Sequence, residues 1–347
     1  MIFHFPILLC GGYFFINDVV EERHSLTLPS ASASASASVA VLNNYGRGGW
    51  NNQRQVLMAG AWVAARMKQH LLIPSTFNED VYHRGSAHPV SSIFNMKKLR
   101  GYVTTLDVRA RSVDQSARVI HLNPDLKFDL RKLPHDEDVV IHTDGWIYVD
   151  LVFPKTSYLW DAFQPHDDYV SCATSVIDKL SENCTEVHAV HMRVTDRDPF
   201  PLWDCKKPLL GKILTEQGLT IHCVFSDGRV VKISDVLKSQ IKDGSCVYVA
   251  TDDASNAQTR DFVKSMDSHR SFLFHDVKPY LSPMCRRLFV SILEQVIVAR
   301  IRGTYVGTFP SSWDEWVYHM RDDPSTLATW KNKLRRYRTR RHPHAGQ

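Results

Sequence analysis

Residues 48–54 read Gly48-Gly49-Trp50-Asn51-Asn52-Gln53-Arg54, between an apolar run at 39–42 and an Ala-rich apolar segment at 56–67. This order predicts a strand, a glycine turn and a helix, which together form a cradle of backbone N–H groups at a helix start. The glycines let the main chain approach a ligand closely, and the polar side chains after them supply hydrogen-bond donors. A diphosphate fits such a cradle, although ordinary β-to-α turns are also built from glycine followed by polar residues.

Length and composition narrow the class of protein. The chain has 347 residues, of which 44% are hydrophobic and 23% charged, as in ordinary globular proteins. This length favours two domains. The formal net charge is +5, but residues 331–341 carry seven Lys or Arg and no acid. The rest of the chain is therefore near neutral, and the sequence does not support a strongly basic nucleic-acid-binding domain.

The first 38 residues differ from the rest of the chain. Residues 2–16 are mostly apolar but fewer than the roughly 20 needed to span a bilayer, so they predict a signal peptide or a weak signal anchor. A wrongly assigned start of the reading frame is the alternative. Residues 30–38 alternate Ser and Ala, with no large side chain to bury, and predict a linker or a simple repeat expansion.

From residue 39 the pattern is that of an α/β protein. The strand at 39–42, the helix at 56–67 and a second strand at 71–74 predict a βαβ unit with parallel strands. Further strands are expected at 118–122, 139–142, 187–192 and 245–251, and further helices at 90–101, 169–180 and 288–301. Aromatic residues gather at 148–163, where we expect core or a seam between domains.

The seven cysteines include no Cys-x-x-Cys pair, so a zinc ribbon or a thioredoxin-type motif is not predicted. In an oxidising compartment the cysteines could form up to three bridges. Cys246 lies in an apolar run and is interpreted as a core residue. Asn183-Cys184-Thr185 is an N-glycosylation acceptor pattern, which matters only if the chain enters the secretory pathway.

A second motif places His191, Arg193 and Asp196 at the carboxyl end of the predicted strand at 187–192. Ligands bind at that edge of open parallel sheets. The planar guanidinium of Arg193 suits bidentate contact with a diphosphate. A structural ion pair between Arg193 and Asp196 is the alternative interpretation.

The strand at 245–251 ends in Asp252 and Asp253. Adjacent residues of an extended chain point in opposite directions, so this pair does not predict a catalytic dyad. One of the two can accept hydrogen bonds from a guanine ring or a ribose. No second acidic or His cluster joins them in the sequence, and no metal site is therefore expected.

Residues 305–313 predict a strand, a turn and the start of a helix. Ser311 and Ser312, with the backbone N–H groups of the helix start, would form a second anion cradle. Ser311 equally fits a plain N-cap.

The three motifs resemble, in sequence and in order, those of the GDP-fucose protein O-fucosyltransferase superfamily, which is related to the α1,6-fucosyltransferases. Residues 48–54 with the following helix and strand resemble its first motif, His191-x-Arg193-x-x-Asp196 its second, and residues 305–313 its third. Val194 replaces the second arginine of the family motif, and Trp313 stands where phenylalanine is usual. The glutamate that some members carry in the first glycine loop is absent, so the general base is left open.

The resemblance covers roughly residues 40–325 and implies a GT-B fold, in which two facing Rossmann-like domains hold the donor in the cleft between them. We assign 39–165 to the N-terminal domain and 166–325 to the C-terminal GDP-sugar-binding domain. Residues 1–38 are then the apolar segment and linker, and 326–347 a basic tail. The implied activity is inverting, metal-independent transfer of fucose from GDP-fucose to a protein or glycan hydroxyl, without a cofactor. The implied location is the endoplasmic reticulum or Golgi lumen, with membrane attachment through the N-terminal segment.

The resemblance also implies roles for individual residues. Arg193 would contact the β-phosphate and act in catalysis, and Asp196 would be the general base or orient Arg193. The expected donor-binding residues are Gly48, Gly49, Asn51, Asn52, Arg54, His191, Asp252, Ser311, Ser312 and Trp313. The alternatives are an α1,6-fucosyltransferase acting on a glycan, a catalytically inactive member that binds a GDP-sugar or a glycan, and a nucleic-acid-binding protein that uses the tail.

Overall fold

The computed structural model describes part of the chain. All of the described residues belong to one compact unit, Ser36–Gln347. The described stretches are 38–41, 50–78, 87–107, 117–122, 138–143, 149–153, 155–193, 223–226, 229–238, 241–266, 269–307 and 311–321. Within these stretches no helix combines the length and the apolar character that crossing a bilayer requires. The apolar segment at 2–16 and the basic tail lie outside them, and the division into two domains remains a prediction.

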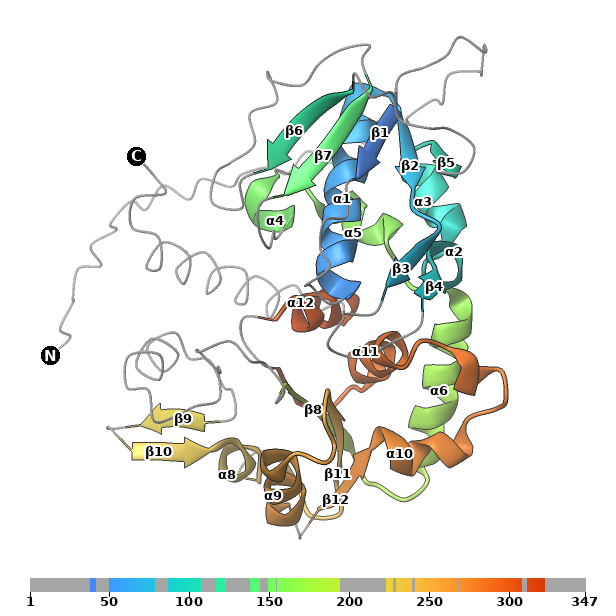
Figure 1. The fold of residues 1–347 in the computed structure, drawn as a ribbon. Helices are drawn as coiled ribbons and strands as arrows, with labels where there is room; N and C mark the ends of the chain where they lie inside the picture. The colour runs from blue at the N-terminus through green and yellow to red at the C-terminus, as the bar shows by residue number, and fades with distance from the viewer. Residues whose placement is uncertain are drawn as a thin grey trace, which may run out of the picture. The chain divides into compact units, whose positions relative to one another are not determined.

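The first sheet is parallel, with the strand order β5-β2-β1-β7-β6 (Figure 1). Its strands are β1 (Ser38–Val41), β2 (His70–Ile73), β5 (Thr105–Asp107), β6 (Arg118–Leu122) and β7 (Val139–Thr143). Val39 of the central strand pairs with Leu71 on one side and Val139 on the other. All three side chains are fully buried, as expected for a parallel sheet covered on both faces. The predicted strands in this part of the chain are confirmed.

Helix α1 (Trp50–Met67) connects β1 to β2 and packs against both strands, which confirms the βαβ unit. It begins six residues before the predicted start at 56. The Trp50 ring lies edge-on to Phe289 and Trp316, at 5.9 and 5.0 Å between ring centroids. This burial holds the polar residues after Trp50 in helical geometry, where local propensity alone does not place them.

The remaining elements of the first part are short. They are β3 (Thr76–Asn78), β4 (Ala87–Pro89), α2 (Val90–Ile93), α3 (Met96–Tyr102), α4 (Val149–Val152) and α5 (Ser157–Ala162). The single helix predicted at 90–101 is wrong. The backbone N–H of Asn95 bonds to Gln164 O, and Asn95 Oδ1 caps α3 by accepting from Lys98 N. Asn95 therefore ends one helix turn and starts the next.

The aromatic stretch at 148–163 is only partly core. Phe153, Trp160 and Phe163 are buried, as expected. Tyr158 is 62% exposed, contrary to the prediction. It lies on the outer side of the short helix α5, whose buried side carries Leu159, Trp160 and Ala162. Tyr148 lies outside the described residues.

The second sheet is also parallel, with the order β12-β11-β8-β13. Its strands are β8 (Val187–Met192), β11 (Cys246–Thr251), β12 (Arg270–Leu273) and β13 (Tyr305–Val306). Successive residues of β8 face two different cores: Ala189 joins the larger core, and Val190 and Met192 join a second one. The strands predicted at 187–192 and 245–251 are thus confirmed as buried on both faces.

Helices cover both faces of the second sheet. Helices α6 (Asp167–Ser181) and α11 (Val290–Arg300) contribute to the larger core, and α8 (Ile233–Lys238) and α9 (Ala257–Ser265) to the smaller one. The other elements are α10 (Phe274–Val277), η3 (Lys278–Tyr280), η4 (Cys285–Arg287), α12 (Ser312–Met320) and the β9 (Cys223–Ser226)–β10 (Arg229–Lys232) hairpin. Helix α11 is buried from Ile292 to Ala299 because it packs against α6, β11 and α12.

Two disulfides link parts of the chain that are distant in sequence. Cys172 on α6 bridges to Cys285, and Cys184 bridges to Cys246 at the start of β11. The interpretation of Cys246 as a core residue was incomplete: the side chain is buried, but it is also bonded to Cys184. Cys10 and Cys205 lie outside the described residues.

Removing the longer-range bridge by changing Cys172 and Cys285 to Ala is expected to lower the free energy of unfolding by about 2–5 kcal/mol. The bridge spans 113 residues. Without it the unfolded chain gains conformational entropy, which stabilises the unfolded state. The matched pair Cys184→Ala and Cys246→Ala opens a span of 62 residues. Its loss of unfolding free energy should be smaller by about 0.5 kcal/mol, because the entropy of closing a loop depends on the logarithm of the loop length. Urea unfolding measures both, and a loss under about 1 kcal/mol for the first pair would contradict the expectation.

Candidate functional site

The first and third motifs meet in space at the starts of two helices. Ser312 Oγ, at the start of α12, donates to Asn52 Oδ1 in the first turn of α1 at 3.0 Å. Arg54 Nη2 donates to the backbone carbonyl of Ser312 at 3.4 Å. Two helix N-termini are therefore adjacent, and each favours negative charge. This is the kind of arrangement that the two predicted anion cradles require.

Helix α11 holds these two helix starts together. Ser291 Oγ accepts hydrogen bonds from the indole N–H groups of Trp50 and Trp313, at 3.2 and 3.3 Å. One turn further along, Gln295 Nε2 donates to Asn51 Oδ1 at 3.2 Å and to Trp313 O at 2.9 Å. Ser291 and Gln295 share one face of the helix. The sequence did not reveal this role, because both residues lie in what reads as a plain apolar helix.

Ser311 is the N-cap of α12. Its Oγ accepts from Trp313 N at 3.2 Å, its backbone is extended, and it is almost completely buried. The structure thus places the Ser311 hydroxyl in a cap that stabilises the helix start, the second of the two interpretations given above. The Ser312 hydroxyl faces Asn52.

The end of β8 is tied to the first turn of α12. His191 Nδ1 lies 2.9 Å from Asp314 Oδ2, and both side chains are almost fully buried. The hydroxyl of Tyr305, on β13, donates to Asp314 Oδ1. The His191 ring stacks on Trp313, with centroids 4.0 Å apart and 19° between the planes. Asp314 therefore connects His191 to the third motif.

Two further features support this position of Asp314. A Cβ at position 307 would lie 2.4 Å from Asp314 Oδ1, so Gly307 leaves the room that the carboxylate occupies. Burial, with the negative charge of Asp314, raises the pKa of Tyr305 well above its ordinary value. Tyr305 consequently stays protonated and acts as a donor at neutral pH.

Arg193 and Asp252 directly follow the neighbouring strands β8 and β11, at the carboxyl edge of the second sheet. Ala250 pairs with His191 and Thr251 with Met192, which is the last pair of the two strands. The Asp253 carboxylate instead accepts from Ser255 N and Oγ, at 2.8 and 2.6 Å, and these contacts lower the pKa of Asp253. Asp253 is thus engaged in a local turn, and Asp252 is the acidic residue that directly follows β11. Gly48, Gly49 and Asp196 lie outside the described residues.

A buried carboxyl lies close to this edge. Tyr248, on β11, donates its hydroxyl to Glu294 Oε1 on α11 at 3.2 Å. Burial raises the pKa of Glu294 to about 8; the hydrogen bond from Tyr248 opposes the rise and the negative charge of Asp252 adds to it. Glu294 is therefore mostly protonated at neutral pH. The sequence showed it only as a polar position in an apolar helix.

Glu294 should make the stability of the protein depend on pH. The ordinary pKa of a glutamate is 4.5, and the pKa of Glu294 in the folded protein is about 8. Between these two pH values the folded state keeps a proton that the unfolded state has lost. Stability therefore falls as the pH rises through this window. Glu294→Gln removes the titration while keeping an acceptor for Tyr248. The difference in Tm between Glu294→Gln and the parent should grow from pH 5 to pH 8, and a difference that is constant with pH would contradict the assignment.

Arg54 lies in the interior, beneath the helix starts. Its side chain is 0% exposed, and its guanidinium carbon lies 4.8 and 5.1 Å from the ring centroids of Trp160 and Trp316. Burial lowers the pKa of Arg54 to about 10, against the opposing effect of the negative charges of Glu315 and Asp150. The expected donor-binding role of Arg54 stays a prediction. The contacts that the structure describes for it are internal.

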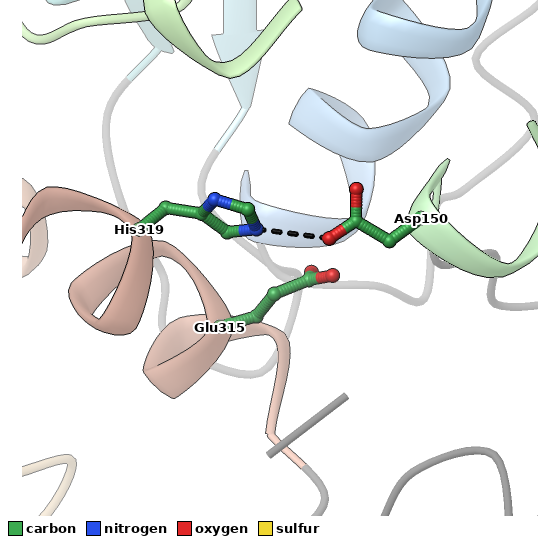
Figure 2. A group of neighbouring side chains, drawn as sticks. All are labelled: Asp150, Glu315 and His319. Carbon is green, nitrogen blue, oxygen red and sulfur yellow. Dashed lines mark hydrogen bonds and ion pairs between the residues drawn. The ribbon is translucent and has the colours of Figure 1, made fainter. Parts of the chain in front are cut away.

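The acidic partners of Arg54 belong to a small polar cluster (Figure 2). Asp150 Oδ2, on α4, lies 3.0 Å from His319 Nε2 on α12. Asp150 Oδ1 accepts from Trp160 Nε1 at 2.8 Å and from the Thr156 hydroxyl. Glu315 accepts from the Gln55 side-chain amide, and Gln55 Oε1 accepts from the backbone N–H of residue 149 at 3.0 Å. The cluster joins α1, the start of α4 and α12.

Asp150, Glu315 and His319 also offer three potential metal ligands within 4.8 Å of one another. Sequence reasoning missed this cluster, because only Glu315 and His319 are close in the chain. Carboxylate and imidazole are common metal ligands. Here, however, the positive charge of Arg54 already acts on both carboxylates. The Asp150 carboxylate is also occupied by Trp160, Thr156 and His319. We therefore interpret the cluster as a buried ion-pair network, in which Asp150 pairs with His319, hydrogen bonds hold both carboxylates, and the charge of Arg54 acts on them.

Comparisons with known proteins identify the fold. No family model matches the sequence, and no curated protein matches it. The structure is similar to POFUT1 in its apo form, with a TM-score of 0.52 at 11% identity, over 85% of this chain and 98% of that one. The complex of POFUT1 with GDP-fucose gives 0.51 at 11% identity, over 84% and 96%. The fucosyltransferase NodZ from Bradyrhizobium gives 0.48 at 10% identity, over 82% and 92%.

At these identities the likeness to POFUT1 concerns the fold. The chain has an O-fucosyltransferase-like fold with parallel sheets, and the resemblance inferred from the three motifs is confirmed at that level.

Proposed function

We propose that this protein is a glycosyltransferase that transfers fucose from GDP-fucose to a hydroxyl of a protein or a glycan, with inversion and without a metal or cofactor. One observation carries the proposal. The starts of α1 and α12 meet through Asn52 and Ser312, and Asp314 in the first turn of α12 binds His191, two residues before Arg193. The similarity in fold to POFUT1, which has been crystallised with GDP-fucose, supports the choice of donor.

The chemistry of such a transfer explains why these groups gather. The acceptor oxygen bonds to the anomeric carbon of fucose, the bond from that carbon to the β-phosphate oxygen breaks, the hydroxyl proton passes to a base, for which Asp196 is the candidate, and GDP leaves. Negative charge grows on the diphosphate as the bond breaks. Arg193 and the two helix N-termini would stabilise that charge electrostatically, which is usually the largest contribution in such a site.

Asp314 would act as a positioning residue. By binding His191 Nδ1 it fixes the plane of the imidazole, and Nε2 lies on the opposite side of the ring. His191 can then form a directed hydrogen bond with the donor sugar nucleotide, as the resemblance implies. Asp196 remains the proposed base, or the residue that orients Arg193.

Asp314→Asn is expected to lower kcat for fucose transfer by up to about 100-fold, since misplacing a positioned group can cost that much. The asparagine side chain cannot accept hydrogen bonds from both Tyr305 and His191 as the carboxylate does. The imidazole of His191 therefore loses its fixed orientation. Donor affinity should change much less than kcat. The control Asp276→Asn alters an exposed carboxylate that accepts from Leu273 N and should leave kcat unchanged. An unchanged kcat in Asp314→Asn would contradict the positioning role.

The proposed location is the lumen of the endoplasmic reticulum or Golgi. Two disulfides in the folded body support it, because such bridges persist in oxidising compartments and are rare in the cytosol. Attachment to the membrane through residues 2–16 belongs to the same proposal.

A donor assay tests the function directly. The purified protein would be incubated with GDP-fucose, GDP-mannose or UDP-glucose, with EDTA present and a mixture of protein and glycan acceptors, and nucleotide release measured. Release of GDP from GDP-fucose alone, with fucose found on an acceptor, is the expected result. Binding of GDP-fucose without any product would indicate an inactive GDP-sugar-binding protein instead.

A further inference from the structure

The triplet Asn183-Cys184-Thr185 has a defined place in the fold that the proposed reaction does not use. It is the only Asn-x-Ser/Thr triplet in the 347-residue sequence. It lies between the end of α6 and the start of β8, and the structure places both Asn183 and Thr185 on the exposed surface. A surface turn is where an N-linked glycan can be accommodated without burying its polar groups.

The backbone of the triplet is held on both sides. Asn183 N donates to Leu180 O at 3.2 Å, and Thr185 N donates to Gly244 O at 3.1 Å. Between them, Cys184 is bonded to Cys246. The contacts that fix the turn therefore come from the backbone, from Cys184 and from the Thr185 hydroxyl, which lies 3.5 Å from Ser245 Oγ. The Asn183 side chain is exposed, so a sugar on its amide requires no change in the fold.

The direction of β8 separates the triplet from the candidate site. Residues 183–185 precede the amino end of β8, whereas His191 and Arg193 lie at its carboxyl end. A six-residue strand extends roughly 20 Å, at about 3.3 Å per residue. A glycan on Asn183 would therefore lie at the edge of the sheet opposite to His191 and Arg193, away from the proposed donor site.

The disulfides supply an independent argument about the compartment. Cys172–Cys285 and Cys184–Cys246 indicate folding where thiols are oxidised, and the secretory lumen is where N-linked glycans are added. The partner of Cys184 is 62 residues further along the chain. At about 5–20 residues per second, synthesis reaches it roughly 3–12 s later. The triplet is thus free of its bridge when it first emerges.

We propose that Asn183 is an N-glycosylation site. The Asn183 amide nitrogen bonds to the anomeric carbon of an oligosaccharide carried on a lipid diphosphate. The bond from that carbon to the diphosphate oxygen breaks, one amide proton is lost to base, and the lipid diphosphate leaves. The Thr185 hydroxyl is the second recognition element. This inference is independent of the proposed transferase reaction and requires only passage through a glycosylating compartment.

Mass spectrometry of the full chain expressed in eukaryotic cells tests the inference. The peptide that contains residue 183 should carry one glycan, and an N-glycosidase should remove it and leave aspartate at that position. Asn183→Gln and Thr185→Ala should abolish the glycan, whereas Thr185→Ser should keep it. Asn183→Gln should bind GDP-fucose as the parent does.

Peptide mapping of the unaltered chain does not depend on how any variant folds. An Asn183 peptide found only in unmodified form would overturn the inference, whether Cys184 is bridged or reduced. A glycan that persists in Thr185→Ala would overturn it as well.

Discussion

Replacing Arg54 with alanine is expected to lower the free energy of unfolding by about 3–5 kcal/mol, the usual cost of leaving a buried charge without its partner. Arg54 is completely enclosed, and the negative charges of Glu315 and Asp150 act on it. Its removal leaves two buried carboxylates without that cation and opens a cavity between the rings of Trp160 and Trp316. Urea unfolding measures the effect.

Arg66→Ala on the same helix is the matched control. Arg66 is exposed and lies over Trp62, with 5.2 Å to the ring centroid, so its removal should cost no more than about 1 kcal/mol. Arg54→Met keeps much of the side-chain volume but removes the charge. Comparing its unfolding free energy with that of Arg54→Ala separates the cost of the cavity from the cost of losing the charge. If Arg54→Ala cost no more than Arg66→Ala, the interpretation of the cluster as an ion-pair network would be wrong.

Arg193→Ala is expected to reduce fucose transfer by about 100- to 1,000-fold, the loss seen when one donor that stabilises developing negative charge is removed. Arg193 is half-buried, directly after β8, and lies two residues along the chain from His191, which pairs with Asp314. The loss should appear in kcat and in donor affinity, because the guanidinium would contact the diphosphate both before and during bond cleavage. GDP release assays measure kcat.

Arg193→Lys keeps the charge but not the planar fork, and should recover only part of the activity. Arg302→Ala, at an exposed position just before β13, should have no effect on transfer. Equal activity of Arg193→Ala and Arg302→Ala would exclude Arg193 from the site.

Local sequence patterns predicted most of the secondary structure around the site. The strands at 187–192 and 245–251 were found because runs of buried residues in a parallel sheet are apolar on both faces. The sequence also marked the first and third motifs as separate anion cradles, and the structure joins their helix starts through Asn52 and Ser312. The errors lie at element ends such as Trp50 and Asn95, where contacts with Trp316 and Gln164, distant in the chain, help to decide the geometry.

The contacts that hold the site together could not be predicted in this way. Asp314 is 123 residues from His191, and Gln295 is 244 residues from Asn51. No local pattern marks such a pair, because the residues come together only when the sheets and helices pack. Asp314 reads as an ordinary acidic residue in the first turn of a helix, and Glu294 as a polar interruption of an apolar one. Their roles depend on burial, which the tertiary structure determines.

Calorimetric titration of the parent protein and of Arg193→Ala with GDP-fucose tests the central claim most directly. The parent should bind GDP-fucose in the presence of EDTA and should not bind UDP-glucose. Arg193→Ala, with an unfolding transition like that of the parent, should lose most of this affinity. A folded parent protein that binds no GDP-sugar, or a variant that binds as tightly as the parent, would contradict the placement of the donor at the end of β8.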